Sequence, residues 1–197
     1  MNTPKRQQKS DNTRQRFINA IIEIIANGEL EHFTIRSLCT SLGLSPRTFY
    51  LYFENKEQAI LQCYGYYSGP LIEEILRRQQ LTNDPYERIL AIFAAKIEVS
   101  LEAARMGRML YICALNYYDP SLYDDTLPFY KIIKASLDDC VSQRALSFTD
   151  DTRTVAWELI DFSRGIVFDY FLRNESYDLR AVSAARMKRY FDTFIKK

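Results

Sequence analysis

The sequence is poor in histidine, glycine and proline: its 197 residues include one histidine, six glycines and six prolines. A Ser-His-Asp, Cys-His or histidine-rich metal site would have to be built around His32, which lies in the polar stretch GELEHFT. We expect His32 to be an exposed turn residue, and we expect neither an enzyme, a metal site nor a cofactor. The scarcity of glycine and proline also argues against an all-β protein full of tight turns.

Long apolar runs and paired cysteine motifs are also lacking. The longest apolar runs, such as residues 89–95, are far too short to span a membrane. The first 16 residues hold five basic residues and one acidic residue, with no apolar stretch behind them, so no signal peptide is expected. We therefore predict a cytoplasmic protein with no membrane partner. Without a CxxC motif, the four cysteines are expected to be reduced core thiols: Cys39, Cys63, Cys113 and Cys140.

Three pairs of adjacent aspartates occur, at 124–125, 138–139 and 150–151. Paired carboxylates could hold Mg²⁺ for diphosphate chemistry in an all-helical enzyme. None of the pairs is followed by a third aspartate three residues on, and the pair at 150–151 falls in an expected first helical turn, which favours acidic side chains. We therefore favour structural roles for all three pairs.

Apolar residues recur with helical spacing along almost the whole chain. The stripe in residues 17–25 predicts a helix that ends at Gly28, and Thr34 is expected to cap the next helix, which stops at Gly43. Ser45 and Pro46 predict the start of a short third helix, and the run from Asn55 to Gln58 resembles a capping box for a fourth.

The rest of the chain repeats this pattern with longer helices. Asp84, Thr149 and Asp178 are expected to cap helices, and residues 117–127 to form a connector. Gly69-Pro70 interrupts the apolar pattern of residues 59–76; it marks either a kink that transmits a ligand signal or a plain loop between two helices. The result is an all-α protein of about nine helices, with no strand.

Residues 34–53 have the spacing of a helix-turn-helix motif, with Gly43 at the bend between two short helices. In such a motif the second helix enters the DNA major groove with its N-terminal residues first. Arg47 has the fork that binds guanine, and Thr48 offers a hydroxyl and a methyl group. Two tyrosines on the same short helix, Tyr50 and Tyr52, would suit phosphate oxygens.

The stretch FTIRSLCTSLGLSPRTFYLYFENKEQAIL resembles the DNA-binding region of the TetR (tetracycline-repressor) family of bacterial regulators. The resemblance covers about residues 12–61, and several spaced positions carry it together: Phe33-Thr34, Gly43-Leu44-Ser45, Tyr50, Tyr52-Phe53 and Lys56-Glu57. It implies an N-terminal arm and helix-turn-helix DNA-binding domain in residues 1–56, followed by a helical ligand-binding and dimerisation domain in residues 57–197. It also implies a homodimer formed through the last two helices, which binds a palindromic operator as a repressor until a small molecule releases it.

Carried over position by position, the resemblance assigns DNA contacts to nine residues. They comprise two at the start of the second helix, four at the base-reading end of the third and three that contact phosphates: Thr34 and Arg36; Ser45, Pro46, Arg47 and Thr48; Tyr50, Tyr52 and Lys56. A helical interaction module and a helical enzyme without a DNA-binding role remain as alternatives. The high aromatic share, 14%, suits a small apolar or aromatic ligand. Five candidates could line its site, although such residues also commonly pack a core: Tyr67, Phe93, Tyr111, Trp157 and Phe162.

Overall fold

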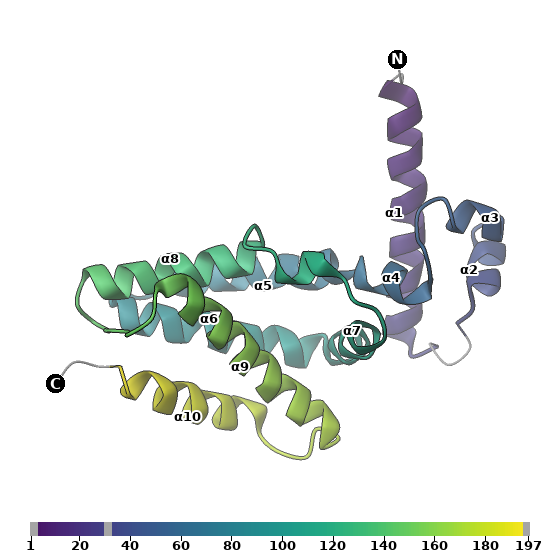
Figure 1. Cartoon of the computed structure of the whole chain (residues 1–197). Coiled ribbons are helices and arrows are strands. Elements are labelled where there is room, and N and C mark those ends of the chain that lie inside the picture. The colour runs from purple at the N-terminus through teal and green to yellow at the C-terminus, as the bar shows by residue number, and fades with distance from the viewer. Residues whose placement is uncertain (1–3, 30–32, 195–197) are drawn as a thin grey trace. The chain divides into compact units, whose positions relative to one another are not determined.

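The computed structural model describes residues 4–29 and 33–194, and in them it is all-helical, as predicted (Figure 1). His32, expected in an exposed turn, lies outside the described residues. The chain divides into two compact units, residues 1–67 with 105–119 and residues 68–104 with 120–197. The expected boundary after residue 56 separates a DNA-binding domain from a ligand-binding domain by function, and it stays a prediction.

The first unit contains four N-terminal helices and one helix from the middle of the chain. They are α1 (Pro4–Asn27), α2 (Ile35–Ser41), α3 (Pro46–Phe49), α4 (Lys56–Leu61) and α7 (Ala104–Asn116). Its core includes a cluster of fully buried aromatic rings from α1, α3 and the segment that follows α3. The ring centroids of Phe17 and Phe49 are 5.5 Å apart, and Phe53 lies 5.1 Å from Phe49 and 6.0 Å from Phe17.

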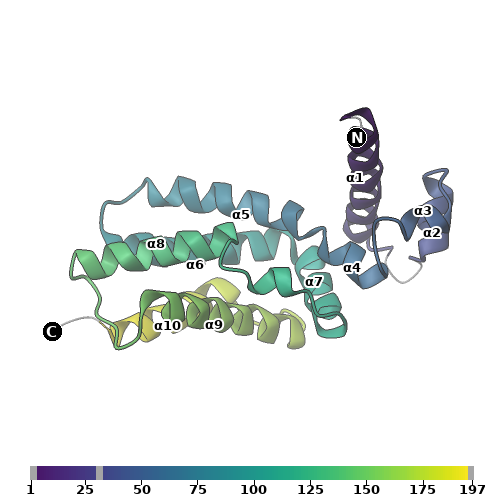
Figure 2. The ribbon, with the colours of Figure 1, turned by 45° about the horizontal axis from the view of Figure 1, so that its top comes forward.

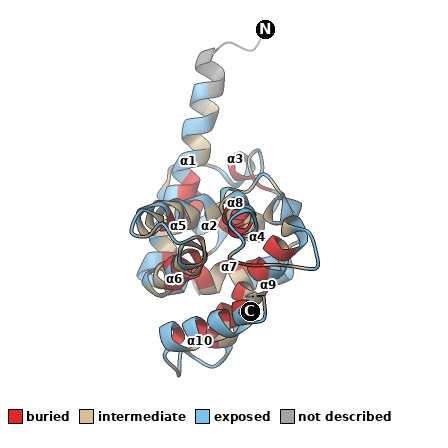
Figure 3. Ribbon diagram, turned by 90° about the vertical axis from the view of Figure 1, so that its left-hand side faces the viewer, coloured by how far each residue is buried: buried red, intermediate tan, exposed pale blue. Residues whose placement is uncertain are grey.

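The second unit is built around α6 (Pro85–Glu102), which contacts α8 (Pro128–Ser142), α9 (Thr152–Leu172) and α10 (Leu179–Asp192). Most of α5 (Tyr64–Gln79) and the 3-10 helix η2 (Pro120–Tyr123) complete it. Figure 2 shows α9 and α10 side by side, and Figure 3 shows buried residues alternating with exposed ones around them. Each helix therefore buries one face, as its apolar periodicity predicted.

Most predicted helix ends are confirmed. Gly28 and Gly43 follow α1 and α2 with positive φ values of 76° and 65°, a backbone conformation that glycine adopts without strain. The side chains of Asp84 and Asp178 accept backbone N–H groups at the starts of α6 and α10.

One expectation about a helix start is wrong, and one of the two alternatives for Gly69-Pro70 is excluded. Asp151, not Thr149, caps α9, accepting the Thr154 N–H at 2.8 Å, because the chain becomes helical only at residue 152. Pro70 lies inside α5 and does not form a loop between helices; the break falls earlier, between α4 and α5.

Two observations concern the cysteines and membrane association. All four cysteines are buried and free, as predicted, and burial raises the pKa of Cys63 to about 12 and that of Cys113 to about 11. Within the described ranges, no helix is both long and apolar enough to cross a membrane.

Candidate DNA-binding surface and ligand site

Local hydrogen bonds fix the turn between α2 and α3. Thr34 and Ser37 form a reciprocal capping box at the start of α2, with the Ser37 N–H 3.0 Å from the Thr34 hydroxyl. After Gly43 the chain turns back, and the Leu44 N–H donates to the Cys39 carbonyl at 2.8 Å. Ser45 then caps α3 by accepting the Thr48 N–H, with Pro46 at the first helical position. The sequence thus specifies this bend through its own caps.

The side chains predicted to contact DNA from the starts of α2 and α3 differ in how free they are. Arg36 and Arg47 are exposed, and within the described part of the chain neither guanidinium has a hydrogen bond or an ion pair. The hydroxyls of Ser45 and Thr48 instead lie 3.0 Å apart and hydrogen-bond to each other. The two arginines are therefore the groups of this surface that are most available to a ligand.

The side chains predicted to contact phosphates are also unequal. The ring of Tyr50 is 57% exposed, whereas Tyr52 is half-buried, with its ring centroid 6.2 Å from that of Phe17. The Lys56 ammonium donates to the Phe33 carbonyl at 2.9 Å and lies 4.6 Å from the centre of the Phe33 ring. Lys56 therefore ties the start of α4 to the segment before α2, a role that sequence reasoning missed.

The cap of α4 also departs from the expected capping box. The Asn55 side chain accepts the Gln58 N–H at 2.7 Å, as predicted. The Gln58 side chain, however, accepts the N–H of Glu54 and not that of Asn55, so the return bond falls one residue early. The extended backbone at Asn55 accounts for this, because it places the preceding N–H within reach.

Helix α7 contacts the N-terminal helices at both of its ends, which sequence reasoning also missed. Arg105 donates to the carbonyl of Ala26 in the last turn of α1 at 2.7 Å, next to Gly28. At the other end the Tyr117 hydroxyl donates to the Glu54 carboxylate at 2.9 Å. These two bonds link α7 to α1 and to the segment between α3 and α4. Contacts between residues so far apart in sequence leave no local signal.

The five candidate ligand residues do not lie together in one unit. Tyr67 and Tyr111 belong to the first unit, and the other three belong to the second. Trp157 stacks on Tyr130 with centroids 5.0 Å apart, and Phe162 stacks on Tyr190 at 5.6 Å. Both rings pack against other aromatic rings of their unit, which is the alternative that the sequence left open.

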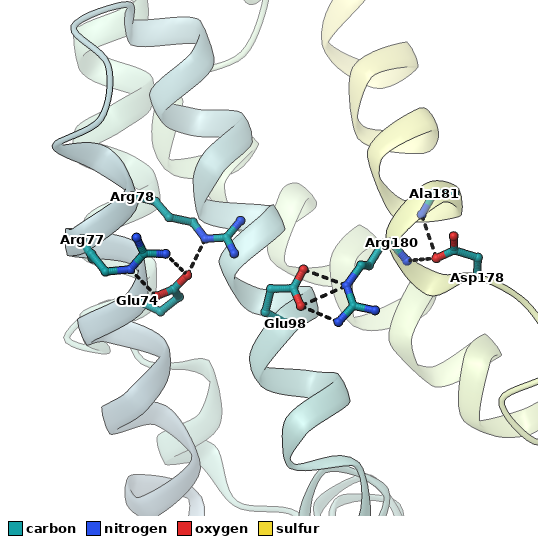
Figure 4. A network of polar contacts seen from close by, with 7 residues as sticks. All are labelled: Glu74, Arg77, Arg78, Glu98, Asp178, Arg180 and Ala181. Carbon is teal, nitrogen blue, oxygen red and sulfur yellow. Dashed lines mark hydrogen bonds and ion pairs between the residues drawn. The ribbon is translucent and has the colours of Figure 1, made fainter.

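Phe93 lines a groove of about 430 Å³ between α6 and α10. Its floor is mostly apolar, with Ile97 and Met187 beside Phe93. On one side of the groove, Arg180 from α10 binds both carboxylate oxygens of Glu98 from α6, at 2.7 to 3.0 Å (Figure 4). This ion pair holds the two helices together at the rim of the groove.

Helix α5 carries a second cluster of charges. Figure 4 shows Glu74 binding both Arg77 and Arg78, at 2.6 to 2.7 Å. These bonds lower the pKa of the Glu74 carboxyl group to about 2. The carboxylate therefore stays ionised and paired at any physiological pH.

The aspartate pairs make structural bonds. Asp125 accepts hydrogen bonds from Arg153 and from the Trp157 indole, which lower its pKa, and Asp138 binds Lys134 and Thr152. In the part of the chain that the structure describes, no three His, Cys, Asp or Glu side chains are grouped so that they could hold a metal ion.

Neither a family model nor a curated protein matches the sequence, but solved structures match the fold. FadR of Thermus thermophilus, a TetR-family transcriptional repressor in complex with lauroyl-CoA, superposes with a TM-score of 0.75 at 19% identity, covering 93% of this chain and 96% of that one. Bacillus subtilis FadR with stearoyl-CoA gives 0.68 at 16% identity, covering 90% and 97%. KstR2 of Mycobacterium tuberculosis, a ketosteroid transcriptional regulator, gives 0.57 at 15%, covering 94% and 96%. This chain has the fold of the TetR-family regulators, with a helix-turn-helix near the N-terminus and a larger helical unit after it.

Proposed function

We propose that the protein is a TetR-family transcriptional repressor of the cytoplasm, a homodimer that binds a palindromic operator and is released by a small ligand. The observation that carries the proposal is the pair of exposed guanidinium groups, Arg36 and Arg47, on a helix-turn-helix whose turn is fixed by its own caps. Arginine at the leading end of a recognition helix is well suited to guanine O6 and N7. Arg47 lies at the leading end of α3, and Arg36 lies in the first turn of α2.

Dimerisation through α9 and α10 follows from the same proposal. One recognition helix of four residues makes few contacts, whereas a twofold dimer doubles them and places two half-sites about 34–36 Å apart.

For the ligand we propose a molecule with an apolar or aromatic body. Two solved structures with this fold hold acyl-CoA esters, and a third is named a ketosteroid transcriptional regulator, which supports a ligand with a large apolar group. The second unit of this chain offers an apolar interior and an apolar groove beside Phe93.

Salt titration of DNA binding tests the proposal. Binding of the full-length protein to duplexes from its own gene's promoter region and to random duplexes is measured between 50 and 300 mM salt. A repressor shows log K falling steeply with log salt, together with promoter affinity far above random affinity. An interaction module or an enzyme binds neither duplex at low salt, and a molecule that remains monomeric at micromolar concentration also contradicts the proposal.

A further inference from the structure

The core of the second unit contains a buried lysine. Lys96, in the middle of α6, is 6% exposed, and its ammonium donates to the Ser163 hydroxyl of α9 at 2.5 Å. The Phe129 ring of α8 lies 5.7 Å from the same nitrogen. Within the described residues no carboxylate lies within ion-pair distance of Lys96. Asp161 and Arg164, the charges that act on its pKa, pair with each other at 3.4 Å.

The ammonium of Lys96 is only partly satisfied. It has three donors, and the hydroxyl of Ser163 takes one of them while donating its own proton to the Ile160 carbonyl at 2.8 Å. Burial lowers the pKa of Lys96 to about 7; the charge of Arg164 lowers it further, and that of Asp161 opposes the shift only in part. A methionine of similar length would fill this position without that cost, so packing alone does not account for a lysine here.

We propose that Lys96 binds the carboxylate of an acidic ligand that enters the second unit between α6, α8 and α9. This inference rests on the proposed function, because it specifies the chemical class of the releasing ligand. A single carboxylate supplies the missing charge and accepts the two remaining ammonium donors. A phosphate dianion would leave a net negative charge buried beside one lysine, which disfavours phosphate esters at this position.

The surroundings of Lys96 define the rest of the ligand. Most buried side chains of the three helices are apolar, among them Ile92, Ile133 and Leu159, although Ser100 of α6 and Ser136 of α8 are buried too. A ligand with its carboxylate at Lys96 therefore presents an aliphatic or aromatic body to these side chains. An aliphatic acid and an aromatic acid would offer Lys96 the same carboxylate, and the experiment below tests acids of both kinds.

The experiment compares acids with neutral analogues of the same shape. The full-length wild type, Lys96→Met and the control Lys131→Met, which alters an exposed lysine of α8, are titrated at pH 7. The probes are straight-chain acids from butanoate to dodecanoate, together with benzoate, phenylacetate and 1-naphthoate, each paired with its primary amide. Isothermal titration calorimetry gives the dissociation constants.

At least one acid is expected to bind the wild type and Lys131→Met at least tenfold more tightly than its amide does. The affinity of the same acid for Lys96→Met is expected to be at least tenfold lower than its affinity for the wild type. Its amide binds all three proteins alike. If only straight-chain acids bind in this way, the ligand has an aliphatic body; if only aromatic acids do, it has an aromatic body. The inference is overturned if no acid in the panel distinguishes the wild type from Lys96→Met, or if acids and amides bind equally.

A second measurement needs no variant. Because the carboxylate stabilises the charged lysine, binding at pH 8 takes up protons, which is measured by repeating the titration in buffers of different ionisation enthalpy. Acid binding without proton uptake also overturns the inference. DNA binding is measured in the same samples, so that the two proposals can fail separately. If the protein binds its operator but binds no acid through Lys96, only the proposed ligand class is refuted. If it binds acids but no duplex, the proposed repressor function is refuted.

Discussion

The buried lysine leads to a prediction about stability that can be worked out from its pKa. Lys96 has an ordinary pKa of 10.5 when exposed and about 7 in the folded core. Between these values the unfolded chain binds more protons than the folded chain, so the contribution of this group to the free energy of unfolding rises with pH. Well inside that window the slope is about 1.4 kcal/mol per pH unit.

Near pH 7 the folded lysine is itself half-titrated, which reduces the slope there. The expected gain between pH 7 and pH 9 is therefore about 2 kcal/mol from this single group. The Lys96→Met variant lacks the group, so it should be more stable than the wild type at pH 7, and its advantage should shrink by about 2 kcal/mol at pH 9. Other titrating groups contribute equally to both proteins and cancel in the difference.

Urea unfolding at pH 7, 8 and 9, at one fixed protein concentration and without ligand, measures this difference. Lys131→Met, on the surface of the same unit, serves as the control and should differ from the wild type by the same amount at every pH. If the gap between the wild type and Lys96→Met stays constant with pH, the lysine is not desolvated in the folded protein and the reasoning is refuted.

Further predictions concern the first unit and α5. Replacing Arg47 with alanine should cost about 1–3 kcal/mol on the operator and relax base preference without changing the thermal midpoint, as competition binding with variant duplexes will show. Lys56→Ala should weaken binding to all duplexes alike and also lower stability by about 1 kcal/mol, because the bond to the Phe33 carbonyl is lost; an unchanged melting temperature would contradict that contact. Gly43→Ala should destabilise the protein by about 1–2 kcal/mol through its φ of 65°, since a Cβ there meets open space and strain is the only penalty; calorimetry that finds no loss would refute this. Pro70→Ala should stabilise α5, because it restores a helical N–H, and unchanged operator affinity and ligand response would argue against a signalling role for this position.

Much of the candidate DNA surface follows from neighbouring residues alone. Thr34, Ser45 and Asn55 cap their helices because each side-chain oxygen reaches an N–H only three residues ahead. Gly43 makes the bend because it adopts a positive φ without strain. Such interactions span a single turn of chain, so their residue types and spacing can be recognised in a sequence.

Lys96 is a polar residue among apolar ones in residues 89–97, but the sequence does not say where its ammonium points. Only the packing of α6 against α8 and α9 places it beside Ser163, 67 residues away, and outside ion-pair distance of every described carboxylate. The same holds for Lys56 on the Phe33 carbonyl and for α7 bound to α1 through Arg105. Helix ends and the recognition bend were determined locally. The partners of buried or bridging charges were decided by tertiary structure, because they depend on which helix faces meet. Apolar periodicity does not fix this, since many sequences with the same periodicity would bring different residues together between the helices.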